Sequence, residues 1–287
     1  MNYKKVLNEV INKLISEELS VSEYLIRGVK SSYKRIINKF GEFYGNGGKI
    51  DGKVFTNIQD TVSFGEYGSV DCYVTIIDFD SKKDMKECFN IYDFGGETDQ
   101  VNYRINLVIM SLNKEVNDGF LYNTLYHEAE HSYQFLRNGK ELHSVLSAYE
   151  KAVRILDGRD KEHNSNEFMM VSNLLYFYNK TEIEANINGL YGELIENGCK
   201  INETNFKVNL DLYENVFNEF VASYEDGKFK KVFSFFNITY NKLISFVKRQ
   251  SEYITYRVRK VYQKALNDYG NEIEERRIIK PLGLYFK

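Results

Sequence analysis

The chain has 287 residues, of which 43% are hydrophobic and 28% are charged, a composition typical of a globular protein rather than of a disordered or fibrous one. Its three cysteines are too few for a disulfide framework, no apolar run is long enough to cross a membrane, and the N-terminal segment lacks the apolar core of a signal peptide. We therefore expect a soluble, cytoplasmic protein with no membrane partner. The net charge of −3 conceals an asymmetry, because residues 227–287 hold 14 Lys and Arg against 5 Asp and Glu.

The first part of the chain is predicted to pass from helices to a small sheet. Apolar residues recur at helical spacing over 3–40, with a break near Ser20 and Ser22, and the five glycines of 41–52 predict a cluster of turns. Four runs between about 53 and 110 then have the composition of strands: KVFTNI, SVDCYVTIIDF, ECFNIYDF and VNYRINLVIM. Because turn signals such as FGGETD separate these runs, we expect an antiparallel or mixed sheet of three or four strands.

The remainder, from Asn117 onward, is predicted to be helical. Pro281 is the single proline of the whole chain, so obligatory helix breakers are almost absent. Breaks are expected at the turn-forming residues, which lie near Asn138–Gly139, Asp157–Gly158, Asn179–Lys180, Gly198, Gly227 and Gly270. The fold class is therefore predicted to be α+β, with a large helical C-terminal part.

The basic end of the chain contains the segment SEYITYRVRKVYQKAL. Its apolar side chains are spaced as one stripe of a helix, and three basic side chains are expected on another face. The stripe consists of Ile254, Val258, Val261 and Ala265, and the basic side chains are Arg257, Lys260 and Lys264. A nucleic-acid surface would be the alternative. Because the stripe requires a packing partner, we expect an internal helix and no nucleic-acid partner.

Residues 127–131 read HEAEH, in a predicted helix that starts after Asn117 as N-cap. On a helix, His127 and His131 lie on one face with Cβ atoms about 5–6 Å apart, so both imidazoles can bind one zinc ion. Glu128 lies next to the first ligand, where its carboxylate can activate a metal-bound water. The H-E-x-x-H pattern therefore predicts a catalytic site with one zinc ion per chain.

A catalytic zinc site needs a third protein ligand. Glu182 lies in the predicted helix TEIEANINGLYG, on the face that also carries Gly189 and Gly192, which permit close approach to a neighbouring helix. Glu184 fits a capping box with Thr181, and this favours Glu182 as the ligand. Other sequence candidates also remain for this position. They are His143 or His163, either of which could instead stabilise an oxyanion, and Cys88, as in deformylases that use Cys with two histidines.

HEAEH, followed some 50 residues later by EIEAN, resembles zinc metallopeptidases of the gluzincin type. Similar elements occur in membrane-linked CAAX-type proteases and in soluble ImmA/IrrE-like peptidases, but the subfamily stays open. The resemblance covers residues 120–140 and 180–192. It implies a zincin-like fold in which a sheet stands over the active-site helix and its edge strand pairs with substrate backbone. It also implies a peptidase with His127, His131 and Glu182 as zinc ligands and Glu128 as general base.

The expected activity is thus hydrolysis of peptide bonds in a peptide or protein substrate. We assign residues 1–116 to an N-terminal subdomain of helices and sheet, and residues 117–287 to a helical subdomain that carries both motifs. Together they would form one composite catalytic unit. The alternative is a binding protein that keeps a zincin scaffold without turnover and contacts nucleic acid through its basic C-terminal helices. The sequence does not indicate an oligomeric state.

Overall fold

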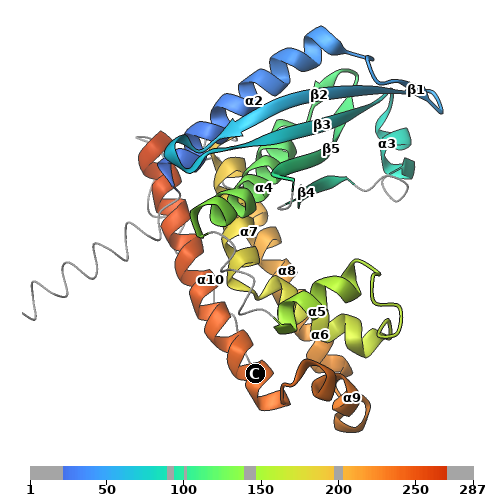
Figure 1. The fold of residues 1–287 in the computed structure, drawn as a ribbon, viewed down its shortest axis with the longest axis vertical. Helices are drawn as coiled ribbons and strands as arrows, with labels where there is room; N and C mark the ends of the chain where they lie inside the picture. The colour runs from blue at the N-terminus through green and yellow to red at the C-terminus, as the bar shows by residue number, and fades with distance from the viewer. Residues whose placement is uncertain (1–21, 89–93, 100–101, 139–146, 197–202, 270–287) are drawn as a thin grey trace, which may run out of the picture. The chain divides into compact units, whose positions relative to one another are not determined.

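The computed structural model describes residues 22–88, 94–99, 102–138, 147–196 and 203–269. These residues form an α+β fold with one small mixed sheet and a mostly helical remainder, as predicted (Figure 1). In the described part of the chain, no helix combines the length and the apolar character that a membrane span requires.

The elements are as follows. The strands are β1 (Gly48–Ile50), β2 (Lys53–Ser63), β3 (Ser69–Phe79), β4 (Gly95–Asp99), β5 (Arg104–Leu112) and β6 (Glu115–Val116). The helices are α2 (Glu23–Phe43), α3 (Lys82–Cys88), α4 (Asp118–Asn138), α5 (Ser147–Leu156), α6 (Asn166–Phe177), α7 (Lys180–Glu196), α8 (Glu203–Ser223), α9 (Asp226–Phe236) and α10 (Tyr240–Tyr269).

The chain divides into two compact units. The first comprises the described residues within Met1–Tyr133, Ile187–Cys199 and Tyr256–Ile273, and the second those within Gln134–Asn186, Lys200–Thr255 and Glu274–Lys287. The divisions fall inside three continuous helices, α4, α7 and α10. The boundary predicted between residues 116 and 117 stays a prediction.

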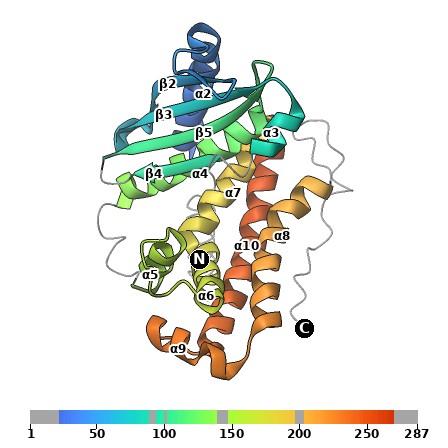
Figure 2. The same ribbon diagram turned by 90° about the vertical axis from the view of Figure 1, so that its right-hand side faces the viewer.

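The first unit is built on the sheet, whose strand order is β1-β2-β3-β5-β4 with β6 paired to β5. The β3–β5 pair is parallel and the other pairs are antiparallel, so the sheet is mixed, as predicted. Strand β4 forms one edge (Figure 2). Alternate side chains of the long strands face a helical layer that includes α2 and α4. Among the buried ones are Ile58, Val62, Val74, Ile76, Ile105, Leu107 and Ile109.

Helices α2 and α4 are fixed to this unit by aromatic and charged contacts. Tyr33 of α2 stacks on Tyr122 of α4 with ring centroids 3.8 Å apart. Arg35 of α2 forms an ion pair with Asp60 of β2 at 2.9 Å, and that pair together with the hydroxyl of Ser32 lowers the pKa of Asp60. The carboxylate of Asp60 therefore stays charged although it lies in the interface between helix and sheet.

The sheet differs from the prediction at three places. Residues 95–99, predicted as a turn, form strand β4. The run ECFNIYDF, predicted as a strand, begins with the end of helix α3, and residues 89–93 lie outside the described residues. The glycine-rich segment 41–52 contains the end of α2 and strand β1 as well as turns. The first two differences have one cause, because a parallel β3–β5 pair requires a long connection, which here carries α3 and β4.

The second unit consists of packed helices, in which α6 contacts α5, α8 and α9. The breaks predicted at 157–158 and 179–180 are present, whereas Gly227 lies within α9, so the break before that helix falls earlier. A further break separates α9 from α10, where Asn237 adopts the left-handed conformation with φ 54°. The predicted breaks at Gly139, Gly198 and Gly270, and the helix predicted for residues 3–19, lie outside the described residues.

Helix α10 buries the predicted stripe, since Ile254, Val258, Val261 and Ala265 are all 3% exposed or less. The prediction for Arg257 was wrong, because this side chain is 1% exposed rather than on the charged face. Arg257 lies three residues after Ile254 and four before Val261, so it falls on the buried stripe itself. Lys264 contacts Glu23 of α2 at 3.2 Å. The basic segment is thus a packed helix.

Candidate metal centre

Helix α4 places the HEAEH segment near its middle. Asn117 caps the helix as predicted, because its Oδ1 accepts a hydrogen bond of 3.0 Å from the backbone N–H of Phe120. Leu121, Leu125 and Ala129 are fully buried and fix the rotation of the helix. His127 and His131 lie on another face and are only partly buried, so part of each side chain is accessible to solvent.

Helix α7 approaches α4 closely within the first unit. A Cβ atom at Gly189 would lie 3.0 Å from the carbonyl oxygen of Asn123, and one at Gly192 would lie 3.1 Å from that of Tyr122. Asn123 also donates a hydrogen bond of 3.2 Å to Glu193 of α7. The small residues of α7 therefore permit close helix packing, as the sequence predicted.

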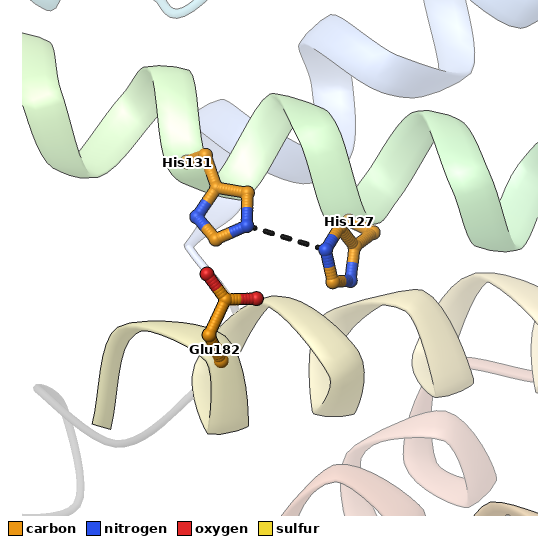
Figure 3. A group of neighbouring side chains, drawn as sticks. All are labelled: His127, His131 and Glu182. Carbon is orange, nitrogen blue, oxygen red and sulfur yellow. Dashed lines mark hydrogen bonds between the residues drawn. The ribbon is translucent and has the colours of Figure 1, made fainter. Parts of the chain in front are cut away.

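Figure 3 shows His127 and His131 on α4 with Glu182 of α7 beside them. The two Nε2 atoms are 3.2 Å apart, and the ligand atoms of all three residues lie within 4.8 Å of one another. A tetrahedral zinc ion with bonds of 2.0–2.1 Å holds its ligand atoms about 3.3 Å apart. The imidazole pair already has this spacing, and the carboxylate of Glu182 lies within 4.8 Å of both ring ligand atoms. The residues present thus fit a zinc ion.

Glu182, not Glu184, is the glutamate of α7 beside the imidazoles. The argument that led to this choice was wrong, however. Helix α7 begins at Lys180, and Asn179 caps it by accepting a hydrogen bond of 2.9 Å from the N–H of Thr181. Thr181 therefore does not cap, and the carboxylate of Glu184 accepts a hydrogen bond from Tyr253. Coordination by Glu182 stays a prediction.

Tyr149 of α5 lies beside Glu182, which is buried at 2% exposure. The Tyr149 hydroxyl donates a hydrogen bond of 2.6 Å to Oε1 of Glu182. Burial raises the pKa of Tyr149, and the adjacent Glu182 carboxylate raises it further, so the hydroxyl keeps its proton. Sequence reasoning missed this residue, because nothing distinguishes Tyr149 from the other 22 tyrosines of the chain.

Glu128 lies between the first histidine and the edge strand. Its Oε1 is 4.0 Å from Nε2 of His127, and its side chain is 8% exposed. The hydroxyl of Thr98 on β4 donates to Oε2 of Glu128 at 2.7 Å and lies 3.0 Å from its backbone oxygen. A Cβ atom at Gly96 would be 2.4 Å from Cγ of Glu128. Strand β4 therefore crosses directly over Glu128, and a larger residue at position 96 would displace the Glu128 side chain.

His163, another ligand candidate from the sequence, does not join this group. His163 places Nδ1 3.0 Å from Asp160, and this hydrogen bond lowers the pKa of the Asp160 carboxyl. Its ring packs against Phe168 and Phe235. His143 and the side chain of Cys88 lie outside the described residues. Among the side chains that the structure describes, His127, His131 and Glu182 are the group with the spacing of metal ligands.

Comparison with known proteins identifies no relative of this chain. The chain matches no protein-family model, and neither a curated protein nor a solved structure is detectably similar to it.

Proposed function

We propose that the protein is a zinc-dependent peptidase of the gluzincin type. His127, His131 and Glu182 would hold one zinc ion, and Glu128 would act as general base. The observation that carries the proposal is the convergence of two imidazoles from α4 and a buried carboxylate from α7 within 4.8 Å. Two histidines and one glutamate leave a fourth position open, which is typical of catalytic rather than structural zinc sites.

The chemistry divides between the metal and Glu128. A bound zinc ion would polarise the scissile carbonyl and increase the acidity of a water molecule. Glu128 would take the proton of the attacking water and pass it to the leaving amine. Thr98 supports this role, because its hydrogen bond to Oε2 fixes the carboxylate while Oε1 stays 4.0 Å from Nε2 of His127.

Strand β4 supports a peptide as the substrate. It ends the sheet order, so among the described strands only β5 pairs with it. An extended peptide can add to such an edge through backbone hydrogen bonds. Because β4 crosses over Glu128, a peptide bound there would carry its backbone past the general base. This arrangement agrees with a zincin-like fold, in which the sheet stands above the active-site helix.

The alternative, a binding protein on the same scaffold, needs the metal ligands but no base. Glu128 is present, buried and hydrogen-bonded beside the ligands, and this favours the peptidase. No observation on the described residues favours a nucleic-acid partner over a peptide, since the basic helix α10 buries its apolar stripe.

The test compares the parent protein with Glu128→Gln for zinc content and for cleavage of a broad peptide library. We expect about one zinc ion per chain in both proteins, and a loss of about 10²- to 10⁴-fold in cleavage for the variant, because an amide cannot accept the proton. Glu42→Gln is the matched control, since Glu42 is an exposed carboxylate of α2 outside both the metal site and strand β4. Unchanged cleavage by Glu128→Gln would refute the general-base role. A zinc-loaded parent that cleaves no peptide would favour the binding protein.

A further inference from the structure

Helix α7 carries two glutamates that each accept a hydrogen bond from a tyrosine. The hydroxyl of Tyr149 donates to Glu182, and that of Tyr253 donates to Glu184. All four residues belong to the second compact unit. The pairs share the same chemistry, but only Glu182 lies beside His127 and His131. The Tyr149–Glu182 pair is therefore a hydrogen bond to a proposed metal ligand, whereas the Tyr253–Glu184 pair is a similar hydrogen bond to a glutamate that is not a proposed ligand.

The Tyr149–Glu182 contact is well defined. Its 2.6 Å length falls within the range of about 2.5–2.7 Å that is typical of a hydroxyl bound to a charged carboxylate. The Tyr149 ring lies parallel to that of Tyr176 of α6, with an interplanar angle of 5° and centroids 5.9 Å apart. Helices α5 and α6 also pack on each other. The phenol is thus held by its ring as well as by its hydroxyl group.

We infer that Tyr149 is a positioning residue for the metal ligand Glu182, an inference that rests on the proposed function. A glutamate side chain has several rotatable bonds, and ordering it on metal binding costs conformational entropy. The hydrogen bond from Tyr149 restrains the carboxylate through Oε1 in the metal-free protein, so the Glu182 side chain would already be ordered when a metal ion binds. Hydrogen bonds of this kind to ligating carboxylates contribute to the affinity of metal sites in general.

The experiment measures zinc affinity by competition with a chromophoric chelator, for the full-length parent protein and for Tyr149→Phe and Tyr253→Phe. We expect Tyr149→Phe to bind zinc about 10- to 100-fold more weakly. Tyr253→Phe should bind like the parent, because it loses a hydroxyl bonded to the other glutamate of the same helix. The stability of each metal-free protein, measured by urea denaturation, separates a loss of affinity from a loss of folding.

A double-mutant cycle with Glu182→Gln tests the route of the effect. If Tyr149 acts through the Glu182 carboxylate, Tyr149→Phe should change zinc affinity little in the Glu182→Gln background. Equal zinc affinity of Tyr149→Phe and the parent would overturn the inference, and so would lost turnover with unchanged zinc affinity, which would assign the hydroxyl to the substrate. A parent protein that binds no zinc would instead overturn the proposed function.

Discussion

Helices α4 and α10 are both long, but they bury different kinds of side chain. The stripe of α10 is apolar and regularly spaced, with Arg257 as its charged exception. Helix α4 also has buried apolar residues, yet it buries a concentration of polar ones, namely Thr124, Glu128, Glu130 and Ser132. Burying polar groups costs free energy unless their hydrogen bonds are satisfied. The comparison shows that packing specifies α10, whereas α4 also buries a hydrogen-bonded carboxylate, Glu128, which the proposed chemistry uses as its base.

The largest expected effect is on α4. His131→Ala should abolish tight zinc binding, because it removes one of three ligands and leaves too few for a stable site. The measurement is zinc content after dialysis against a weak chelator. His163→Ala is the control, since that histidine pairs with Asp160 instead. Stoichiometric zinc in a His127→Ala/His131→Ala double variant would end the metal-site interpretation and, with it, the contrast between the two helices.

The next effect concerns α10, where a cavity should cost stability but not metal. Ile254 is fully buried, so Ile254→Ala should lower the free energy of unfolding by about 2–5 kcal/mol. The zinc content per folded chain should be unchanged. Urea denaturation of the metal-free protein measures the free energy of unfolding. Lys260→Ala, at an exposed position of the same helix, should stay within about 0.5 kcal/mol of the parent. Loss of zinc from folded Ile254→Ala would contradict this difference, because α10 would then contribute to metal binding as well as to packing.

The smallest effect is expected for the ion pair between α10 and α2. The side chain of Glu23 is 64% exposed, and that of Lys264 is 19% exposed, so water screens most of their attraction. Lys264→Ala should therefore change the free energy of unfolding by less than about 1 kcal/mol. Denaturation at low and high salt measures this difference. A larger, salt-insensitive loss would show that the stem of Lys264, rather than its charge, contributes to the packing of α10.

Local spacing explains which parts of the fold could be predicted. The stripe of α10 and the HEAEH helix follow from a 3.6-residue period and from an N-cap, both of which depend on near neighbours. Strand β4 has neither the alternation nor the apolar residues of a strand. Its backbone pairs with β5, with Gly96 opposite Leu107, and this pairing needs no particular side chains on β4. The strand is thus defined by its backbone pairing with β5, the next strand along the chain, while its own residues give only a turn signal.

The candidate site was predicted from the sequence only in part. His127, Glu128 and His131 are recognisable because one helix turn joins them. Glu182 was preferred over Glu184 by a capping argument that the structure contradicts, since Asn179 caps α7. Tyr149 and Thr98 contact the site through tertiary structure, from 33 and 30 residues away along the chain. Such contacts leave no periodic signal in the sequence, so the residues that hydrogen-bond to Glu182 and Glu128 could be identified only from the structure.

Gly96 shows how the site limits the substitutions that the chain can tolerate. A Cβ atom at this position would lie 2.4 Å from Cγ and 2.8 Å from Oε1 of Glu128, so the glutamate would have to move. Every missense change of a glycine codon adds at least that atom. Because the obstacle is a side chain and not the backbone, the variant chain can still fold while Glu128 is displaced. If Glu128 is the general base as proposed, a genetic selection for activity should disfavour missense changes at codon 96, whereas a buried position such as Ile254 would accept a similar aliphatic residue.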